Sequence, residues 1–447
     1  MKKRTFLKMS SAIISGSVLS PIVSWEKSDK LKNWAGNITF STNNVHYPDS
    51  VEQVQEFVKK ASKLKVLGSR HCFNRIADST DNLMSLKQMD KVVTLDEKAH
   101  TVTVDAAMKY GQLCPYLDSK GFALHNLASL PHISIAGASA TATHGSGIKN
   151  GNLSTAVSGL EIVTADGNIL TLSKQKDGEK FAAAVVNLGA IGVVTKVTLN
   201  IQPSFMMRQN VYVNLPFAQM KDHFENIMSS GYSVSLFTDW KAKSVNEVWI
   251  KSKAEEEDFT LKPEFFGAKA ATENLHPIAE LSAVNCTEQL GVPGQWYGRL
   301  PHFKMGFTPS SGKELQSEFF VPRHNAVDAI LAVQQLNEQI SPHLLISEIR
   351  TIDADNLWMS PCYKQSSVTI HFTWKPDWPA VSKVLPVIEK ELSPFNARPH
   401  WGKLFTMSPD KLKSLYEKLP DFQKMIKNYD PTGKFRNDFL DRNIYNS

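Results

Sequence analysis

The sequence has few cysteines, and this scarcity argues against a cross-linked scaffold or a cysteine-rich metal site. Its 447 residues include only four, Cys72, Cys114, Cys286 and Cys362, with no C-x-x-C pair and no spacing typical of metal ligands. We therefore expect four separate thiols in preference to a disulfide, and we expect no metal site.

The sequence also has only a small excess of positive over negative charge. The net charge is +6, and the basic residues Lys2, Lys3, Arg4 and Lys8 leave only +2 for the rest of the chain. Such a balance gives no electrostatic footprint for nucleic acid. A composition of 42% hydrophobic and 21% charged residues is ordinary for globular proteins. Because the length exceeds what one core usually supports, we expect two domains.

A dinucleotide-binding fingerprint is missing too. No G-x-G-x-x-G opens a helix with an acidic residue about twenty positions further on, which disfavours a Rossmann-type oxidoreductase. The pattern instead predicts strands separated by helical stretches, with glycine turns at strand ends. Hairpins are expected within 92–104 and 159–172, a short helix within 110–121, and a β-branched strand after the glycines of 187–199. This order favours an α+β domain.

The first 25 residues have the composition of an export signal. A basic start precedes a short, weakly apolar stretch over 10–24, which is too short for a membrane span. The run from Lys3 to Lys8 is similar to the twin-arginine signature, with lysine in the first arginine position. We expect export to a bacterial periplasm by that route, and no stable membrane span once the signal is removed. A general secretory signal or a retained N-terminal anchor is the alternative.

The stretch 65–74 reads as a buried strand that runs into a glycine turn and presents a histidine. Ahead of it, 50–53 is typical of a capping box, and apolar residues at helical spacing over 51–61 predict a helix that feeds the strand. Gly68 lets backbone N–H groups approach a phosphate or a planar ring closely, and Arg70 adds positive charge. The turn therefore suits an anionic cofactor, with an ordinary surface turn as the alternative.

A second glycine segment, 128–147, runs for twenty positions almost without charge. It contains Gly137, Gly145 and Gly147 among small hydroxylated side chains. Such a stretch is too polar for a core strand and too uncharged for a solvated loop. We expect it to lie against a large ligand, with its backbone amides turned inward.

From about residue 203 the sequence changes to aromatic-rich strands and amphipathic helices. Strands are predicted at 205–215 and 232–238, and a helix at 326–339. Near the end of this region, the loop 398–405 sets Trp and Gly beside two cations. This composition suggests a loop that places Lys403 against a flat, electron-rich group.

Two strands within 345–374 carry the most informative polar residues. Strand alternation puts Glu348 and Arg350 on one face of the first strand, and His371 and Thr373 on one face of the second. If the strands are neighbours, they display an acid, a base, a cation and a hydroxyl toward one cavity. A solvated sheet face with an ordinary ion pair is the alternative.

The two glycine segments together resemble the flavin domain of the vanillyl-alcohol-oxidase superfamily. Within it the sequence is most similar to the alditol oxidases, with sugar-1,4-lactone oxidases as nearer relatives than the rest, from about Asn33 to the C-terminus. The resemblance implies a two-domain, PCMH-type FAD-binding α+β fold, whose inserted cap domain is built on an antiparallel sheet flanked by helices. The expected units are an export signal at 1–25, an FAD-binding domain at 26–204, a substrate or cap domain at 205–404 and a C-terminal tail at 405–447 that returns to the FAD domain.

The same resemblance implies how FAD is held. His71 matches the position that carries the flavin covalently through its 8α-methyl group, with a non-bonded histidine stacked on the flavin as the alternative. Cys72 stands where a serine is usual, which alters local hydrogen bonding because a thiol donates poorly. His132 and His144 fit structural or phosphate-side positions. The expected cofactor-binding set is Gly68, Ser69, Arg70, His71, Cys72, Asn74, Ala128, Ser129, Ser134, Gly137, Thr141, Thr143, His144, Gly145, Ser146, Gly147, Gly192 and Val194.

Oxidation of an alcohol requires a base for the hydroxyl proton and positive charge near the charge that develops on the flavin. The resemblance assigns His371 as the base, and Lys403 with Arg350 as the cations near the flavin and the reacting hydroxyl. Glu348 either joins the chemistry or aligns Arg350 and binds a hydroxyl. The implied substrate pocket is Ser129, Glu348, Arg350, His371, Thr373 and Lys403.

The resemblance therefore predicts FAD-dependent oxidation of the terminal hydroxyl of a polyol such as xylitol or sorbitol, with O2 reduced to hydrogen peroxide. One alternative is a sugar-1,4-lactone oxidase or a dehydrogenase that uses a quinone-type acceptor. Another is a flavin-loaded or sugar-binding export protein without turnover. Ala128 resembles the position that helps to control oxygen access, where alanine occurs in oxidases and in dehydrogenases. The expected partners are the small-molecule polyol and O2, and we expect a monomer.

Overall fold

The computed structural model describes residues 30–255, 262–307 and 312–445. The expected export signal at 1–25 lies outside these ranges. Within them, every helix is too short or too polar to span a bilayer. Each of the four cysteines is free, which confirms the prediction of separate thiols.

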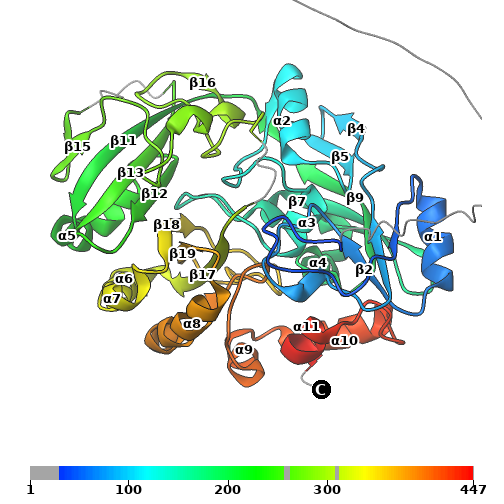
Figure 1. Cartoon of the computed structure of the whole chain (residues 1–447). Helices are drawn as coiled ribbons and strands as arrows, with labels where there is room; N and C mark the ends of the chain where they lie inside the picture. Colours follow the sequence, from blue (N-terminus) through cyan, green and yellow to red (C-terminus); the bar gives the residue numbers. More distant parts are fainter. Residues whose placement is uncertain (1–29, 256–261, 308–311, 446–447) are drawn as a thin grey trace, which may run out of the picture.

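The first half of the chain forms small sheets with short helices around them (Figure 1). A parallel three-stranded sheet has the order β1-β3-β2, an antiparallel five-stranded sheet has the order β4-β5-β9-β7-β8, and β6 pairs with β10. The strands are β1 (Val45–His46), β2 (Leu64–Leu67), β3 (Asn82–Ser85), β4 (Val92–Asp96), β5 (Thr101–Asp105), β6 (Phe122–Ala123), β7 (Val157–Val163), β8 (Ile169–Ser173), β9 (Val193–Asn200) and β10 (Gln202–Pro203). The helices are α1 (Val51–Lys60), α2 (Tyr110–Ser119), α3 (Ile135–Ala140) and α4 (Lys174–Val185).

The second half forms one large antiparallel sheet, with ten strands in the described residues. Its order is β14-β15-β11-β13-β12-β18-β19-β17-β20, and β16 pairs with β11. The strands are β11 (Met206–Pro216), β12 (Ser233–Thr238), β13 (Ser244–Lys253), β14 (Glu264–Phe265), β15 (Ala268–Ala270), β16 (Gly294–Gln295), β17 (Leu315–Pro322), β18 (Leu344–Ile352), β19 (Ser367–Trp374) and β20 (Arg398–Pro399). The helices of this half and of the tail are α5 (Phe217–Met228), α6 (Ala326–Gln334), α7 (Asn337–Ile340), α8 (Trp378–Leu392), α9 (Pro409–Leu415), α10 (Leu419–Tyr429) and α11 (Asp438–Leu440).

The helix and strand that lead into the first glycine turn form as predicted. α1 begins after Ser50, whose Oγ accepts a hydrogen bond from the Gln53 N–H at 3.4 Å. Val54 and Val58 supply the buried stripe of this helix. β2 then pairs in parallel with β3, so that the chain reaches Gly68 directly from a strand held on one edge.

Two predicted elements differ from the structure. The helix predicted at 326–339 is divided into α6 and α7, because its middle tightens to a turn in which the Leu336 N–H donates to the Val333 carbonyl. The second glycine segment contains a short helix, α3, that its composition did not predict. Small side chains allow this helix to pack tightly, with Ile135, Ala138 and Ser139 buried.

One row of side chains crosses five strands of the large sheet and lies on the polar face of that sheet. Directly paired residues share a face of a sheet, so this row points to one side. In register across β13, β12, β18, β19 and β17, the row consists of Glu247, Phe237, Glu348, His371 and Glu318.

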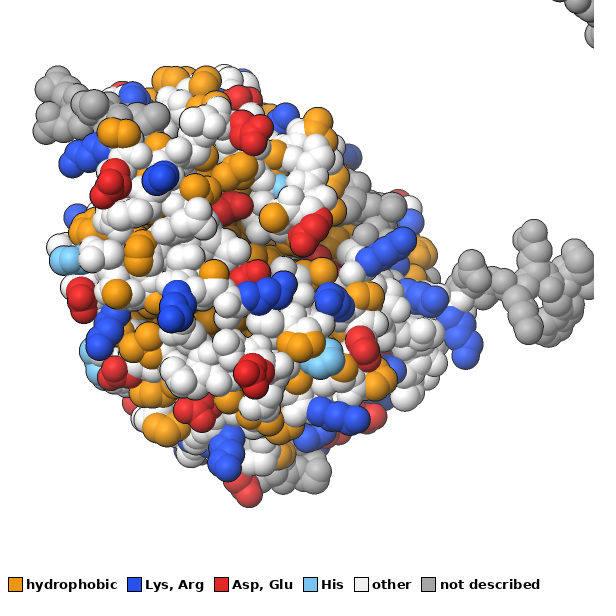
Figure 2. All heavy atoms as spheres, turned by 60° about the vertical axis from the view of Figure 1, so that its left-hand side comes forward, with side chains coloured by type: hydrophobic (Ala, Val, Ile, Leu, Met, Phe, Trp, Pro, Cys, Tyr) orange, Lys and Arg blue, Asp and Glu red, His pale blue; other side chains and the backbone are white. Residues whose placement is uncertain are grey.

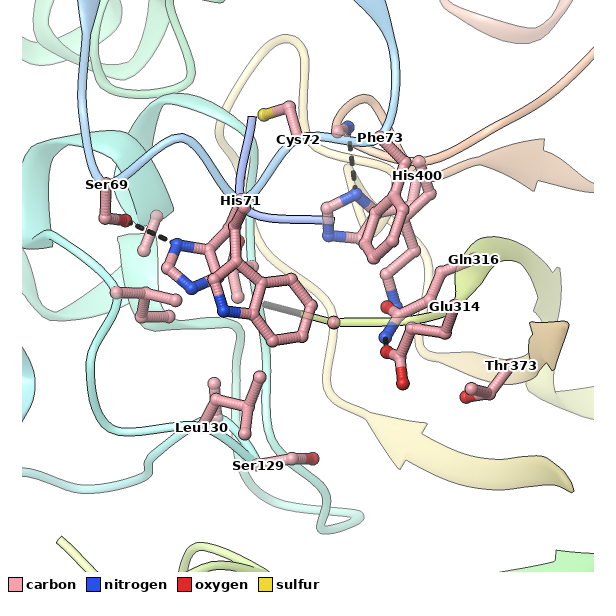
Figure 3. Close-up of a pocket in the computed structure, with 18 of the residues that line it drawn as sticks. Ser69, His71, Cys72, Phe73, Ser129, Leu130, Glu314, Gln316, Thr373 and His400 are labelled. Atoms are coloured by element: carbon pink, nitrogen blue, oxygen red, sulfur yellow. Dashed lines mark hydrogen bonds between the residues drawn. The ribbon is translucent and has the colours of Figure 1, made fainter. Parts of the chain in front are cut away.

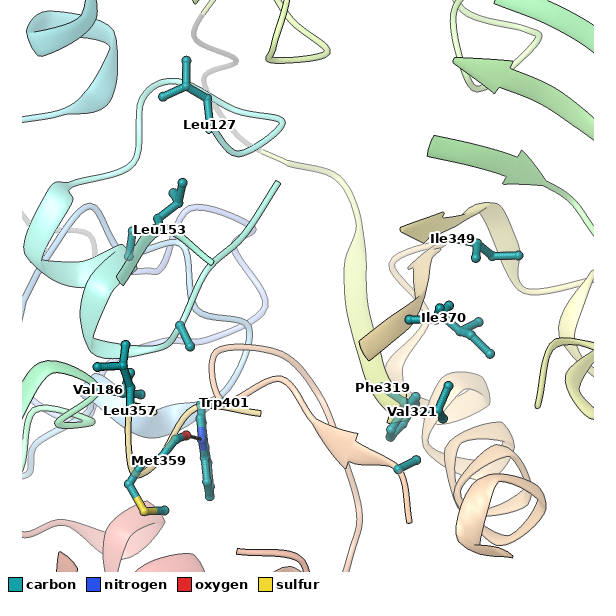
Figure 4. Close-up of a cluster of buried hydrophobic side chains, with 14 of the residues drawn as sticks. Leu127, Leu153, Val186, Phe319, Val321, Ile349, Leu357, Met359, Ile370 and Trp401 are labelled. Atoms are coloured by element: carbon teal, nitrogen blue, oxygen red, sulfur yellow. Dashed lines mark hydrogen bonds between the residues drawn. The ribbon is translucent and has the colours of Figure 1, made fainter. Parts of the chain in front are cut away.

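The opposite face of the same strands belongs to the hydrophobic core. Ile349, Ile370 and Phe319 are paired in register one position beyond the polar row and are fully buried (Figure 4). α6 contacts β17 and β19 on this side, and α8 packs on α6. The helices therefore cover the apolar face, which leaves the polar face for the cavity.

The C-terminal tail lies against the first half of the chain (Figure 1). The Nζ of buried Lys434 donates to the carbonyls of Val58 and Ala165. In the opposite direction, Nζ of buried Lys65 donates to the Phe435 carbonyl at 3.2 Å. Two buried lysines thus tie the tail to the helix and strand that precede the first glycine turn.

Figure 2 shows one face of the surface, on which Lys and Arg are interspersed with Asp and Glu. Hydrophobic side chains are scattered between them. The charge on this face is therefore mixed and not of one sign.

Candidate functional site

A cavity of about 660 Å³ lies between the first glycine turn and the polar row of the large sheet. The two glycine segments form one wall. β17, β18, β19 and the loops at 276–285 and 302–314 contribute described residues to the other. Figure 3 shows Ser69 and His71 on one side of this space, and Glu314, Gln316 and Thr373 on the other.

Glycine is required at the turn because the two glycine segments touch there. A Cβ on Gly68 would lie 2.7 Å from the Ser134 Oγ, and a Cβ on Gly137 would lie 2.8 Å from the same atom. Ser134 Oγ accepts from the Ser69 N–H at 3.2 Å, and Ser69 Oγ accepts from the Ser134 N–H at 3.0 Å. This reciprocal pair locks the two segments into one wall.

His71 presents a free ring nitrogen in this wall. Its Nδ1 lies 2.9 Å from Ser69 Oγ, whereas its Nε2 is buried without a hydrogen-bond partner in the described residues (Figure 3). Trp34 stacks on the ring with centroids 5.1 Å apart, and the His132 ring lies 4.6 Å away. Burial, followed by the nearby His132 and Lys109, lowers the pKa of His71 to about 3. The imidazole is therefore neutral near pH 7, as a nucleophilic histidine must be.

The carboxylate of Glu318 is the hub of the charged cluster in the opposite wall. It is completely buried and accepts from Lys403 Nζ at 2.6 Å and from Arg350 Nη2 at 2.7 Å. His144 Nε2 lies 3.2 Å from it. Burial by itself raises the pKa of Glu318, but Lys403, His144 and Arg350 outweigh burial and hold this pKa well below its usual range. The two cations predicted from the sequence are therefore held in place by a shared anion.

Glu348 is fixed between a cation and a histidine. Its Oε1 accepts from His302 Nε2 at 2.7 Å, and its Oε2 lies 3.5 Å from Arg350 Nε. Burial raises the pKa of Glu348, but Arg350 and His302 outweigh burial, so the carboxyl group is ionised. This geometry makes Glu348 an oriented hydrogen-bond acceptor.

His371 lies directly opposite Glu348 in the register of β18 and β19. Its Nε2 is buried and has no hydrogen-bond partner in the part of the chain that the structure describes. Burial and the neighbouring Lys403 hold the pKa of His371 well below its usual range. Thr373, two positions on, shares its face and lines the cavity. A neutral imidazole here is available to accept a proton.

His144, Glu318 and His400 bring one possible metal-ligand atom each within 4.8 Å of one another. The Glu318 carboxylate already binds Lys403 and Arg350, so a divalent cation would add positive charge to a site that is neutralised. His400 Nδ1 in turn accepts from a backbone N–H. We interpret this cluster as part of the charged network.

Most of the residues predicted to bind cofactor or substrate line the cavity. They are Gly68, Ser69, Arg70, His71, Cys72, Asn74, Ala128, Ser129, Gly137, Thr141, Thr143, His144, Glu348, Arg350, His371, Thr373 and Lys403. Six others of the predicted set are not among the lining residues, namely Ser134, Gly145, Ser146, Gly147, Gly192 and Val194.

Packing explains the positions of several of the six. Ser146 Oγ donates to the Val234 carbonyl, so it joins the second glycine segment to the large sheet. A Cβ on Gly145 would lie 2.3 Å from the Leu127 carbonyl oxygen, and one on Gly192 would lie 2.5 Å from the Val163 carbonyl oxygen. These glycines therefore allow close contact between backbone segments.

Two further differences concern Arg70 and the loop before β9. Arg70 is exposed and its Nη1 donates to the Lys32 carbonyl at 3.0 Å, so its guanidinium binds the backbone of another segment of the chain. In place of Gly192 and Val194, the loop before β9 reaches the cavity with Leu188 and Gly189.

Sequence reasoning missed Glu318, His302 and His400. A lone glutamate inside the apolar strand 315–322 was a usable signal, because a carboxylate in such a strand requires a partner. His302 lies in a loop with no periodicity, and only the fold brings it to Glu348. His400 lies in the loop 398–405, from which Lys403 was predicted as a site residue, but the sequence assigned no role to His400.

Two family models match the sequence: an FAD binding domain over residues 43–173 and D-arabinono-1,4-lactone oxidase over residues 308–443. Alditol oxidase from a Streptomyces species is 42% identical over 416 residues, which cover 92% of this chain and 98% of that protein. L-Gulonolactone oxidase from Bos taurus is 27% identical, with 94% and 99% covered. L-Gulono-1,4-lactone dehydrogenase from Mycobacterium tuberculosis is 25% identical, with 92% and 98% covered.

Solved structures share the fold at low sequence identity. A solvent-stable cholesterol oxidase matches with a TM-score of 0.75 at 16% identity, covering 92% of this chain and 96% of that one. Glucooligosaccharide oxidase from Acremonium strictum matches with a TM-score of 0.70 at 14% identity, covering 92% and 94%. These matches confirm the predicted PCMH-type α+β fold.

The residues present fit an FAD cofactor. Gly68 and Gly137 line the cavity with backbone, because Ser134 leaves no room for a side chain at either position. His71 lines the same cavity, and its Nε2 has no partner in the described residues. The cavity then continues to the cations and carboxylates of the large sheet. With the matching FAD binding domain and the 42% identity over nearly the whole length, the chain belongs to the alditol oxidase family of FAD-linked oxidoreductases.

Proposed function

We propose that this protein oxidises the terminal hydroxyl of an alditol to the aldehyde and reduces O2 to hydrogen peroxide. The observation that carries the proposal is the convergence of Glu348, Arg350, His371 and Lys403 on one end of a cavity whose other wall presents His71. The 42% identity to an alditol oxidase supports the same substrate class. Alditol and O2 together supply the atoms and electrons of the aldehyde and the peroxide.

When bound, FAD supplies the acceptor for the hydride that leaves the alcohol carbon. His371 accepts the hydroxyl proton at Nε2, which has no hydrogen-bond partner in the described residues. Lys403 and Arg350 place positive charge where negative charge develops, and Glu318 keeps both cations in position.

Polar groups around the reacting carbon select a polyhydroxylated substrate. Glu348 accepts a hydrogen bond from a substrate hydroxyl, and Ser129 and Thr373 offer hydroxyls of their own at the cavity wall. A substrate that lacks a hydroxyl here leaves a buried polar group unpaired, which costs about 1–3 kcal/mol per group. The pocket therefore favours alditols over simple alcohols.

The second candidate function is oxidation of a sugar-1,4-lactone, by O2 or by a quinone-type acceptor. The match of residues 308–443 to the D-arabinono-1,4-lactone oxidase family favours it, because this range contains Glu318, Glu348, His371 and Lys403. It shares the flavin-binding wall with the first candidate, so the substrate and the electron acceptor are what separate the two.

A peroxide assay across alditols and lactones separates these candidates. We expect xylitol and sorbitol to give hydrogen peroxide at rates well above those for L-gulono-1,4-lactone and D-arabinono-1,4-lactone. A lactone that outperforms every alditol would reverse the assignment. Flavin-containing protein without peroxide from either class would favour a quinone-type acceptor or a binding protein.

The proposal includes a covalent bond between a His71 ring nitrogen and the 8α carbon of FAD. The bond replaces one N–H and one C–H, and O2 takes up the two hydrogens and their electrons as hydrogen peroxide. Glucooligosaccharide oxidase is described with a 6-S-cysteinyl, 8α-N1-histidyl FAD. Within the described residues His71 Nε2 has no hydrogen-bond partner, and the pKa of His71 is low; both observations support a histidyl link to the 8α carbon here.

Changing His71 to alanine should release the flavin on denaturation, because the only proposed attachment point is gone. Wild-type protein should stay yellow after acid precipitation and carry the mass of FAD. His46→Ala, outside the cavity, is the matched control and should keep the flavin. Free loss of flavin from denatured wild-type protein would exclude the covalent bond.

We also propose export to the periplasm by a twin-arginine-like signal and function as a monomer. The basic, weakly apolar residues 1–25 support the first proposal. Fractionation of the producing cells and the molecular mass of the purified protein in solution test the two.

A further inference from the structure

Two buried residues, Lys251 and His302, are linked to Glu348 by hydrogen bonds. Neither has a part in the chemistry proposed above. Lys251 of β13 is 1% exposed. Its Nζ donates to the carbonyls of Leu300 and Pro301, at 2.5 and 3.0 Å, and lies 3.3 Å from His302 Nδ1. Lys251 Nζ thus has three hydrogen-bond partners.

This arrangement decides which nitrogen of His302 carries the proton. The ionised Glu348 carboxylate can only accept a hydrogen bond, so the one ring proton of neutral His302 must be on the nitrogen that faces it, and Nδ1 is left as the acceptor from Lys251. The ring proton is then on Nε2, which lies 2.7 Å from Glu348 Oε1. Lys251, His302 and Glu348 form one chain of hydrogen bonds with a fixed direction.

The ring of His302 is also held mechanically. Its edge-to-face neighbours are Phe237, with ring centroids 5.4 Å apart, and Trp249, with centroids 5.2 Å apart. Its backbone carbonyl accepts from the Thr287 N–H at 2.9 Å. The imidazole therefore has little freedom to turn or to leave the carboxylate.

We propose that His302, held by Lys251, is the positioning residue that aims the Glu348 carboxylate at the substrate. With Oε1 occupied by His302, Oε2 is the atom left to face Arg350 and a substrate hydroxyl. Burial lowers the pKa of Lys251 to about 7 and that of His302 to about 4, although Glu348 opposes both shifts. The histidine thus acts as a neutral donor, and it binds the carboxylate without adding a full charge.

Activity measurements of this inference rest on the proposed alditol oxidation. His302→Met removes the donor and should raise the KM for xylitol about tenfold or more, because a hydrogen bond to a charged group contributes about 1.5–3 kcal/mol. The kcat should change much less, since in the described residues His302 makes no hydrogen bond to His371, Lys403 or Arg350. His302→Gln restores a donor at the position of Nε2 and should recover most of the loss. Equal effects of Met and Gln on KM would overturn the proposal.

A double-mutant cycle separates positioning from a general structural role. If His302 acts through Glu348, His302→Met should add little to the loss already caused by Glu348→Gln. If the losses multiply, the two residues act independently, which would contradict the relay, meaning the hydrogen-bond chain from Lys251 through His302 to Glu348. The comparison is made on proteins with full flavin content.

Nitrogen-15 NMR of histidine-labelled, flavin-loaded protein tests the relay without turnover. We expect the His302 proton on Nε2 in the wild type, and a changed tautomer balance in Lys251→Met, where Nδ1 loses its donor. A proton on Nδ1 in the wild type would overturn the relay whatever the substrate. If the NMR result holds while no alditol is oxidised, the proposed function fails and the relay stands.

Discussion

Glu318→Gln should lower the free energy of unfolding by about 3 kcal/mol or more, because removal of one partner from a buried ion cluster leaves the other charges uncompensated. The change keeps the shape of the side chain and removes the anion between Lys403 and Arg350. Urea unfolding of the flavin-loaded protein measures the effect as a shift in midpoint.

The matched control is Glu225→Gln, which removes the partner of Arg323 on the surface. The Glu225 side chain is 58% exposed, so its loss should cost less than about 1 kcal/mol. Equal midpoints for the two variants would contradict the role of Glu318 as the anion that holds the site together.

The stabilisation by Glu318 has a predictable pH dependence. The folded-state pKa of Glu318 is depressed, so its stabilisation is present above the unfolded pKa and is lost as pH falls through the folded pKa. The stability gap between wild type and Glu318→Gln should be constant near neutral pH and should narrow only in acid, below about pH 4.3, the ordinary pKa of glutamate.

Lys403→Met should reduce the rate of flavin reduction by about a hundredfold to a thousandfold, the usual loss when one group that stabilises developing charge is removed. The flavin should remain bound, since Lys403 lies on the wall opposite His71. Anaerobic stopped-flow mixing with xylitol measures the step directly.

Lys364→Met is the control for this prediction, because Lys364 pairs with Glu417 on the surface, with both side chains more than half exposed. It should reduce flavin at the wild-type rate. A wild-type rate in Lys403→Met would remove Lys403 from the chemistry, whatever its contact with Glu318.

Strand periodicity was sufficient to predict the central pairs of the site. Alternation along β18 and β19 placed Glu348 with Arg350 and His371 with Thr373, and the register then set Glu348 opposite His371. The first glycine turn was equally readable, because a capped helix, a buried strand and Gly68 follow one another in the sequence. These features depend on local geometry, which a sequence pattern records.

Other parts of the site depend on contacts between distant segments. Nothing near His302 in the sequence shows that it reaches Glu348, since its neighbours Phe237, Trp249 and Glu348 come from three different strands. Gly145 and Gly192 lie in segments that have the composition expected of a ligand-binding loop, yet both glycines allow close packing of backbone segments. A glycine that makes room for a ligand and one that makes room for the chain have the same sequence signature.

The two half-reactions behind the peroxide assay test the central claim most directly. Anaerobic protein mixed with xylitol should lose its oxidised-flavin absorbance rapidly, and admission of O2 should restore it rapidly with one hydrogen peroxide for each aldehyde. Flavin that stays oxidised with every alditol but is reduced by a sugar-1,4-lactone would contradict the claim. So would reduced protein that persists in air and is reoxidised only by a quinone.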